Sequence, residues 1–402
     1  MDLIERVLDG EVPLHRIEEH CDGPDEAADV RRRVVARLTG SESDHVGEMA
    51  FDAGRATERN VENLVGATHL PLGVAGPLPV SGGAAEDEYV VPLATTEGAL
   101  VASVNRGCSA LAAAGGVESV VVEEAMTRAP VFRVDGVAEA ERTVDWVEAH
   151  HNALAEAAEA TTSHGELLDV DPYVVGTNVF LRFGYDTKDA MGMNMATVAT
   201  EAAAEVVEEE TPAELVALSG NLCADKKPAA INLVEGRGRS VVAEAVLSED
   251  VLEERLNASP GAMLEVHDRK TVVGSTKAGT LGANAHAANV VAAVFLATGQ
   301  DAAQVVEASS AITSFEPHAD GLHVSVSIPA LELGTVGGGT GLATQREALE
   351  MLGVAGGGDP AGSHARELSE VVAGAVLAGE LSLHAALASD DLGSSHEELG
   401  RG

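Results

Sequence analysis

The spacing of apolar and polar positions changes twice along the chain and so divides it into parts. Near the start, PDEAADVRRRVVARLTG predicts a helix, because Pro24 suits the first turn and Gly40 suits the end. Residues 1–50 are therefore expected to form a small helical arm. From about residue 55 to 115 the chain is richer in glycine and loops, and EYVVPLA is typical of a strand.

A different pattern occupies residues 116–218. VFRVDG predicts a strand, and AERTVDWVEAHHNALAEAAEA has helical spacing through Val144, Val147 and Leu154. Two further strands are expected in ELLDVDPYVVG and TNVFLRFGYDT, then a helix in DAMGMNMATVATEAAAEVVEE and a closing strand in ELVALSG. This order is the split βαβ arrangement of ferredoxin-like domains. We interpret residues 116–218 as a separate domain inserted into a larger one.

The larger domain then consists of residues 51–115 and 219–402. Its second part contains glycine-rich turns, the Ala/Val-rich helix NAHAANVVAAVFLATG, the cluster GTVGGGT and an acidic tail. The predicted fold class is α+β, with a mixed helical and sheet domain that carries the insertion and the arm. No run of 18 apolar residues is found, and the N-terminus is acidic, so neither a membrane span nor a signal peptide is expected.

Charge sets this chain apart from an average globular protein. It carries 65 acidic and 25 basic residues, for a formal net charge of −40. At about 1 M salt the Debye length is only about 3 Å, so repulsion between surface carboxylates is largely screened. Such a surface therefore suits a protein that works inside a cell with a very high salt concentration. The hydrophobic share of 45% argues against a disordered acidic chain. Nucleic acids and anionic membranes would be repelled.

The three cysteines bear on the compartment. Cys21, Cys108 and Cys223 are odd in number and far apart in the sequence. They fit reduced thiols in a cytoplasm better than a disulfide framework.

The acidic chain contains only five lysines, which are Lys188, Lys226, Lys227, Lys270 and Lys277. Two of them, Lys226 and Lys227, are adjacent in the stretch SGNLCADKKPAAIN. An ammonium group suits a developing oxyanion or a bound carboxylate. The alternative is a solvated turn with a surface ion pair. The depletion of lysine elsewhere favours a shaped anion site, because a turn that needed only charge could have used arginine or aspartate.

Two glycine-containing segments could meet a nucleotide. DAMGMNMA holds three of the eight methionines, and Gly192 lies in the first turn of the predicted helix, where a phosphate could approach. The alternative, favoured by spacing alone, makes Asp189 the N-cap and the methionines core residues. GTVGGGT is equally compatible with close approach of a ligand and with a flexible turn.

The remaining candidates give weaker local signals. In GQDAAQ, Asp301 precedes Gln304 by three residues and resembles a capping box, so a structural cap is favoured. His396 lies close to the C-terminus, and Glu62 gives no local indication of catalysis.

Taken together, the segments resemble one family, 3-hydroxy-3-methylglutaryl-CoA (HMG-CoA) reductase. The matching stretches run in the family's order across residues 61–402: ENLVGATHLPLGVAGPL, TTEGALVASVNRGC, DAMGMNM, SGNLCADKKPAAINLVEGRGRSVVAEA, GTLGANAHAANVVAAVFLATGQDAAQ, GTVGGGT and SSHEELGRG. The resemblance implies reduction of HMG-CoA to mevalonate and free CoA with two NADPH, in the biosynthetic class. It also implies a large substrate domain, an inserted nicotinamide domain, and dimers or tetramers with active sites at the subunit interface near ENLVG.

The resemblance further assigns four catalytic residues. Lys226 would stabilise the oxyanion, and Asp301 would hydrogen-bond that lysine. Glu62 would donate a proton during reduction of the aldehyde, a role that needs a raised carboxyl pKa. His396 would protonate the departing CoA thiolate, which suits an imidazole near neutral pH.

Two further sets follow from the same matching. The residues implied in substrate binding are Arg106, Ser219, Asp225, Lys227, Lys270 and Asn289. Those implied in NADPH binding are Ser163, Asp189, Met191, Gly192, Met193, Asn194, Gly337, Gly338 and Arg401. Relatives place a Ser-Arg pair on the 2′-phosphate where this chain has Ser163 and His164, and Arg401 could supply that charge. No metal is expected.

Two alternatives remain open at this point. One is the degradative enzyme, which oxidises mevalonate with NAD. The other is a CoA-ester-binding protein without turnover, which predicts loss of at least one of the four catalytic residues, whereas the chain keeps all four. With no anchor expected before the catalytic region, we predict a cytoplasmic enzyme from a salt-adapted microbe.

Overall fold

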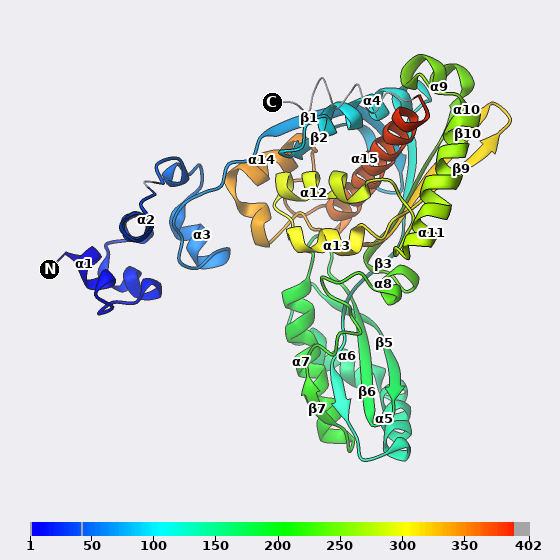
Figure 1. Cartoon of the computed structure of the whole chain (residues 1–402). Helices are drawn as coiled ribbons and strands as arrows, with labels where there is room; N and C mark the ends of the chain where they lie inside the picture. Colours follow the sequence, from blue (N-terminus) through cyan, green and yellow to red (C-terminus); the bar gives the residue numbers. More distant parts are fainter. Residues whose placement is uncertain (1, 42, 390–402) are drawn as a thin grey trace.

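A computed structural model describes residues 2–41 and 43–389. Figure 1 shows three parts: a body built on a large sheet, a small lobe that projects downward from the body, and an N-terminal arm that extends to the left. The arm contains α1 (Leu3–Leu8), η1 (Leu14–His20), α2 (Pro24–Thr39), η2 (His45–Gly47) and α3 (Ala53–Arg59).

The arm has a hydrophobic core of its own. Pro24 begins α2, and Gly40 ends it in a left-handed conformation with φ 77°, as the sequence predicts. Buried side chains of the preceding helices pack on α2. A second small cluster joins Ala28 of α2 to Ala53 and Leu64. The arm's packing therefore continues past residue 50, where the sequence analysis placed its end.

The body's sheet has the strand order β2-β1-β3-β8-β10-β9. Its strands are β1 (Leu72–Gly82), β2 (Glu86–Ala94), β3 (Val117–Arg128), β8 (Arg237–Ser248), β9 (Ile312–His318) and β10 (Gly321–Leu331). Only β1 and β3 pair in parallel, and α4 (Leu100–Ala113) lies between them in the sequence. The other neighbours are antiparallel, which agrees with the predicted α+β class.

Helices pack against this sheet and form the main core. They include α12 (Ala287–Thr298) and α15 (Ser363–Ala388). The body also contains α8 (Ala230–Val234), α9 (Glu249–Leu256), α10 (Pro260–Val266), the π-helical η3 (His267–Gly274), α11 (Ser275–Ala278), η4 (Ala302–Gln304), α13 (Val305–Ala308), η5 (Gly338–Gly341) and α14 (Ala343–Met351).

The sequence analysis did not identify α15, although it is the longest helix in the described part of the chain. In the residues that the structure describes, α15 alone is long and apolar enough to cross a membrane, and 83% of its apolar window is buried inside the fold. Its buried charges have partners: Glu370 accepts hydrogen bonds from the N–H groups of Gly83, Ala84 and Ala85. Its apolar character therefore follows from packing against the sheet.

The small lobe has the predicted split βαβ order. Its elements are β4 (Val131–Arg133), α5 (Val137–Ala149), α6 (His151–Glu159), β5 (Glu166–Val175), β6 (Asn178–Asp186), α7 (Met193–Glu210) and β7 (Glu214–Ala217). The strands run antiparallel in the order β7-β4-β6-β5. The single helix expected after β4 is in fact two, because His150 leaves helical geometry at φ −121° and ψ 28°.

The crossing between body and lobe falls inside β3 rather than at residue 116. This strand pairs with β8 as far as Ala125, and from Met126 it pairs with β6 of the lobe. One continuous strand therefore belongs to both sheets, and it ties the lobe to the body. The chain returns near Gly220, whose N–H donates to the carbonyl of Ala129.

Candidate active site

The loop that carries Lys226 is held in a strained conformation. Asn221, Ala224 and Lys226 have φ of 64°, 47° and 56°. Each left-handed residue of this kind costs on the order of 1–2 kcal/mol, so the surroundings must impose the shape. The N–H of Lys226 donates to the carboxylate of Glu307, and Asn232 donates to the same carboxylate at 2.8 Å. The backbone of Lys226 is thus fixed before any ligand binds.

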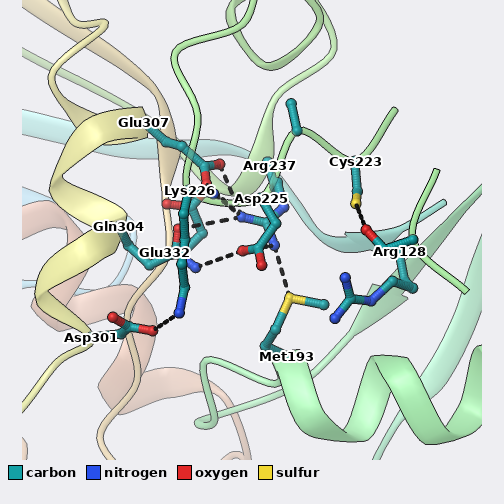
Figure 2. Close-up of polar contacts among 12 residues, drawn as sticks. Arg128, Met193, Cys223, Asp225, Lys226, Arg237, Asp301, Gln304, Glu307 and Glu332 are labelled. Atoms are coloured by element: carbon teal, nitrogen blue, oxygen red, sulfur yellow. Dashed lines mark hydrogen bonds and ion pairs between the residues drawn. The ribbon is translucent and has the colours of Figure 1, made fainter. Parts of the chain in front are cut away.

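The amine of Lys226 pairs with Asp301. Its Nζ lies 2.6 Å from Oδ2 of Asp301 (Figure 2). The other oxygen, Oδ1, accepts from the N–H of Ala303 at 3.0 Å and caps η4. The hydrogen bond to Asp301 raises the pKa of Lys226, although partial burial opposes the shift. The lysine stays charged while its side chain remains 44% exposed, so a ligand can reach it.

Asp301 therefore is both a helix cap and an ion-pair partner. The capping box that the sequence suggested does not form, because Gln304 does not turn back to Asp301. Nε2 of Gln304 donates instead to Oδ1 of Asp225 at 3.0 Å.

Beside Lys226 lies a buried cluster centred on Arg237, the first residue of β8 (Figure 2). Its Nη1 lies 2.9 Å from Oε2 of Glu307 and 3.3 Å from Oε1 of Glu332. Its Nη2 lies 3.0 Å from Oδ1 of Asp225. Burial alone would lower the pKa of Arg237, but the three carboxylates raise it, so the guanidinium stays charged. We call these four residues, with Gln304, the Arg237 cluster.

The pKa values of two carboxyl groups of the cluster are shifted in opposite directions. Burial raises the pKa of Glu332 well above its usual value, and the hydrogen bond with Glu307 adds to this effect. Burial therefore favours the protonated form of Glu332. For Asp225, burial acts in the same direction, but the charge of Arg237 and the hydrogen bond from Gln304 outweigh it and lower the pKa. Asp225 thus stays ionised beside Lys226.

A cavity of about 670 Å³ opens beside Lys226 and Asp301. Six of the residues expected at the cofactor line it: Met191, Gly192, Met193, Asn194, Gly337 and Gly338. The start of α7 and the glycine-rich loop before α14 thus face the lysine–aspartate pair across one space.

The glycines of this cavity serve distinct purposes. Gly192 has φ 90°, and a Cβ there would lie 2.2 Å from Cγ2 of Thr187, so no side chain fits. Gly337 and Gly338 have φ of 78° and 52°, and a Cβ on either would meet nothing within 4 Å. The loop therefore presents bare backbone to the cavity, as a closely bound dinucleotide would require.

Asp189 requires a correction. It neither lines the cavity nor caps α7, whose N-cap is Gly192. Its carboxylate is buried and accepts from the N–H groups of Gly358, Gly362 and Ala365 at 2.9, 2.7 and 3.1 Å. Its side chain therefore holds the start of α15 to the lobe and is unavailable to a cofactor.

This arrangement predicts the effect of replacing Asp189 by alanine. Three buried donors would lose a charged acceptor, so the free energy of unfolding is expected to fall by about 3 kcal/mol. The KM for the nicotinamide cofactor should change less than about twofold. Thermal melts and steady-state kinetics check both values, with exposed Asp145→Ala as the control. A large rise in KM without loss of stability would restore the cofactor role.

Ser219, Asp225 and Lys227 lie on the same loop as Lys226. Nζ of Lys227 donates to the carbonyl of Asp225 at 3.0 Å, and Oγ of Ser219 lies 3.8 Å from Sγ of Cys223. Ser219 and Lys227 are exposed, so their polar groups can turn to a ligand.

The other three expected substrate residues do not line this cavity, and two of them lie beside the second half of α15. Arg106 on α4 donates to Oγ and the carbonyl of Ser382, at 3.1 and 2.6 Å. Lys270 on η3 lines a separate hollow together with Ala388. Asn289 is on α12, which packs against α15. One chain thus contains two separate groups of expected site residues.

The remaining expected residues are dispersed. Glu62 is exposed in the link between α3 and β1, and Ser163 is exposed after α6. Neither lines the cavity beside Lys226. His396 and Arg401 lie outside the described residues. No group of three or more His, Cys, Asp or Glu residues that could hold a metal ion occurs within residues 2–41 and 43–389.

Sequence reasoning missed the Arg237 cluster apart from Asp225. The one available signal was EGRG, in which an arginine stands between two glycines ahead of an apolar strand. Glu307 and Glu332 gave no such signal, because in so acidic a sequence a glutamate that will be buried cannot be distinguished from the many exposed ones.

An α+β body with a ferredoxin-like lobe and a paired lysine beside a glycine-lined cavity defines a two-domain enzyme. A family model described as Hydroxymethylglutaryl-coenzyme A reductase matches residues 27–401, and the chain belongs to this family. It is 62% identical to the 3-hydroxy-3-methylglutaryl-coenzyme A reductase of Halobacterium salinarum, over 100% of this chain and 98% of that protein. Against the Haloferax volcanii protein of that name, identity is 61%, over 99% and 98%. Both relatives are from halophiles, in agreement with the acidic composition.

The fold also resembles a solved structure. This is the class II 3-hydroxy-3-methylglutaryl-CoA reductase of Streptococcus pneumoniae bound to NADPH, with a TM-score of 0.68 and 19% identity. The match covers 89% of this chain and 86% of that one. It supports the predicted fold.

Proposed function

We propose that this enzyme reduces HMG-CoA to mevalonate and free CoA, with two NADPH consumed in the biosynthetic direction. The observation that carries the proposal is the cavity in which the Lys226–Asp301 pair faces Met191–Asn194 and the glycine loop. NADPH supplies the hydride for each of two reductions. The bare backbone at Gly337 and Gly338 supports close binding of the dinucleotide.

Lys226 is the centre of the proposed chemistry. Hydride addition to a thioester carbonyl, and then to an aldehyde, places negative charge on oxygen. A charged amine already held in position stabilises that oxygen without reorganising water. Asp301 fixes the amine and keeps it protonated, while Asp225, Ser219 and Lys227 are placed to bind the substrate's polar groups. In the proposed division of labour, the inserted lobe holds the cofactor and the body holds substrate.

Two proton transfers complete the proposal. Glu62 protonates the product of aldehyde reduction, and His396 protonates the CoA thiolate. Glu62 does not line the Lys226 cavity of its own chain. A second copy of the chain can bring it there.

We therefore propose a homo-oligomer, a dimer or a tetramer, with the site shared between subunits. In support, Arg106 and Lys270 lie beside α15, and neither they nor Asn289 line the Lys226 cavity. The sheet also has exposed valines, among them Val120 and Val122 of β3, which a second copy can cover.

Shared sites predict complementation between two inactive variants. Lys226→Ala and Lys270→Ala proteins should each lose most activity. Mixed subunits should regain up to about a quarter to a half of it, because half of the sites in a mixed dimer would have both lysines. Activity after co-refolding measures this, and a mixture of Lys226→Ala with Lys226→Met is the control. If mixed oligomers recovered no activity, Lys226 and Lys270 of one active site would have to come from the same chain.

Incubation with HMG-CoA and NADPH in concentrated KCl tests the function itself. The expected result is loss of nicotinamide absorbance together with mevalonate and free CoA. NADH and the reverse reaction with NAD test the degradative alternative, and a large NADH preference would overturn the cofactor assignment. Binding of HMG-CoA without turnover would favour the non-catalytic alternative.

The proposed compartment is the cytoplasm. Cys21, Cys108 and Cys223 are all free thiols in the described chain, which suits a reducing environment.

A further inference from the structure

Next to the Lys226 cavity lies a second, smaller hollow of about 380 Å³ between the arm and the body. One wall is α3, which contributes Arg55 and Arg59, and the opposite wall is α14 with Arg346. Figure 1 shows α3 beside α14 where the arm meets the body. We call this space the arginine pocket.

The arginine pocket adjoins the cavity of the proposed active site. Both spaces are lined by Asn60, Gly337, Gly338 and Leu342. These four residues thus form the boundary between the two spaces, and a ligand that crosses the glycine loop can extend from Lys226 toward the three arginines.

Three arginines and one carboxylate, Asp52, line this hollow, an excess of positive charge that is unusual on a surface as acidic as this one. Exposed arginines of the arm, such as Arg33 and Arg37, pair with carboxylates of the arm. Within the described chain, no hydrogen bond or ion pair is found for the guanidinium of Arg55 or of Arg59. Arg346 has one partner, Glu350, at 3.0 Å.

Arg55 and Arg59 both lie on the side of α3 that lines the hollow. Arg55 and Arg59 are four residues apart on α3, so they share one face of the helix. Nη2 of Arg55 comes within 3.1 Å of the point that a Cβ on Gly341 would occupy. The absence of a side chain at Gly341 lets the guanidinium reach the pocket.

We propose that the arginine pocket binds a phosphate group of one of the two nucleotide substrates, which extends from the cavity that holds its reactive end. This inference rests on the proposed function. Guanidinium groups bind phosphate oxygens through paired hydrogen bonds, and a phosphate provides the counter-charge that Arg55 and Arg59 lack among the described residues. The phosphate belongs to NADPH or to the CoA ester, and the two sources are distinguished by kinetics.

The test compares the double variant Arg55→Gln/Arg59→Gln with Arg33→Gln/Arg37→Gln. The control removes the same charge from the same arm, again at positions four residues apart. In concentrated KCl, the KM for one nucleotide should rise about tenfold to a hundredfold in the first variant only, through loss of charged hydrogen bonds. The kcat at saturation should change much less.

The KM values for the individual substrates identify which nucleotide provides the phosphate. A rise in KM for NADPH but not NADH assigns the pocket to the 2′-phosphate, and a rise for both assigns it to the diphosphate. A rise for HMG-CoA alone assigns it to CoA. Unchanged KM values for all three, with the wild-type enzyme active, would overturn the inference and leave the proposed function standing.

A second variant keeps the test decisive if loss of both arginines unfolds the arm. Arg346→Gln acts from the opposite wall and should raise the same KM by about threefold to tenfold. Replacement of Arg55 and Arg59 by lysine should restore part of the affinity, because charge remains while paired geometry is lost. A drop in kcat without any change in KM would indicate a merely structural role.

Discussion

Replacement of Lys226 by alanine is expected to lower kcat about a thousandfold, because a preorganised donor to the developing oxyanion would be lost. Binding of HMG-CoA should remain detectable, since Asp225, Ser219 and Lys227 stay on the loop. Steady-state kinetics and a titration with HMG-CoA in the absence of NADPH measure the two effects separately. The control is Lys277→Ala, which removes an exposed lysine from α11. If Lys226→Ala kept more than about a tenth of the wild-type kcat, the oxyanion role would be wrong.

The pH dependence gives an independent check on the same amine. Its hydrogen bond to Asp301 raises the pKa of Lys226. The ammonium therefore persists to higher pH than in a free lysine, and activity that needs it is lost only as pH rises through the raised pKa. Asp301→Asn removes the cause, so the alkaline limb of the normalised kcat profile should move to lower pH. An unmoved limb would mean that another group sets it.

Replacement of Arg237 by methionine should give the largest loss of stability, about 3–5 kcal/mol, because it leaves buried carboxylates without their counter-charge. The side chains of Arg237, Glu307 and Glu332 are all 0% exposed. Chemical denaturation in concentrated KCl measures the loss. Arg133→Met is the matched control: its pair with Glu214 is on the surface, with 63% and 67% of the two side chains exposed, so it should cost at most about 1 kcal/mol.

A double variant tests the cause of that loss. If the charge of Glu307 is what becomes costly, then Glu307→Gln combined with Arg237→Met should be more stable than Arg237→Met alone. Glu332→Gln by itself should cost little stability, because burial favours the protonated form of Glu332, which a neutral amide resembles. Equal losses for Arg237→Met and Arg133→Met would contradict the importance of the buried cluster. Glu307 also accepts a hydrogen bond from the N–H of Lys226, so in Arg237→Met the activity should fall together with the stability.

Sequence reasoning predicted the elements whose causes are local. The helix from Pro24 to Gly40 and the strand and helix order of the small lobe follow from turn residues and from the spacing of apolar positions. It did not find α15, because a helix buried on all sides has no polar face and so lacks the amphipathic pattern that marks surface helices. Asp189 was misplaced for a similar reason. A carboxylate near a glycine resembles a local cap, whereas its partners are the N–H groups of Gly358, Gly362 and Ala365.

By itself, the sequence determined the acidic surface, the retained lysines, the split βαβ order and the resemblance to HMG-CoA reductase, because composition, periodicity and motif order are properties of the chain. Only the tertiary structure decided that Lys226 contacts Asp301, that a buried arginine holds Asp225 in place, and that two arginines of the arm line a hollow with the glycine loop. These contacts join residues up to hundreds of positions apart. Their energies depend on burial and on charges brought together by folding, and neither is visible in the order of the residues.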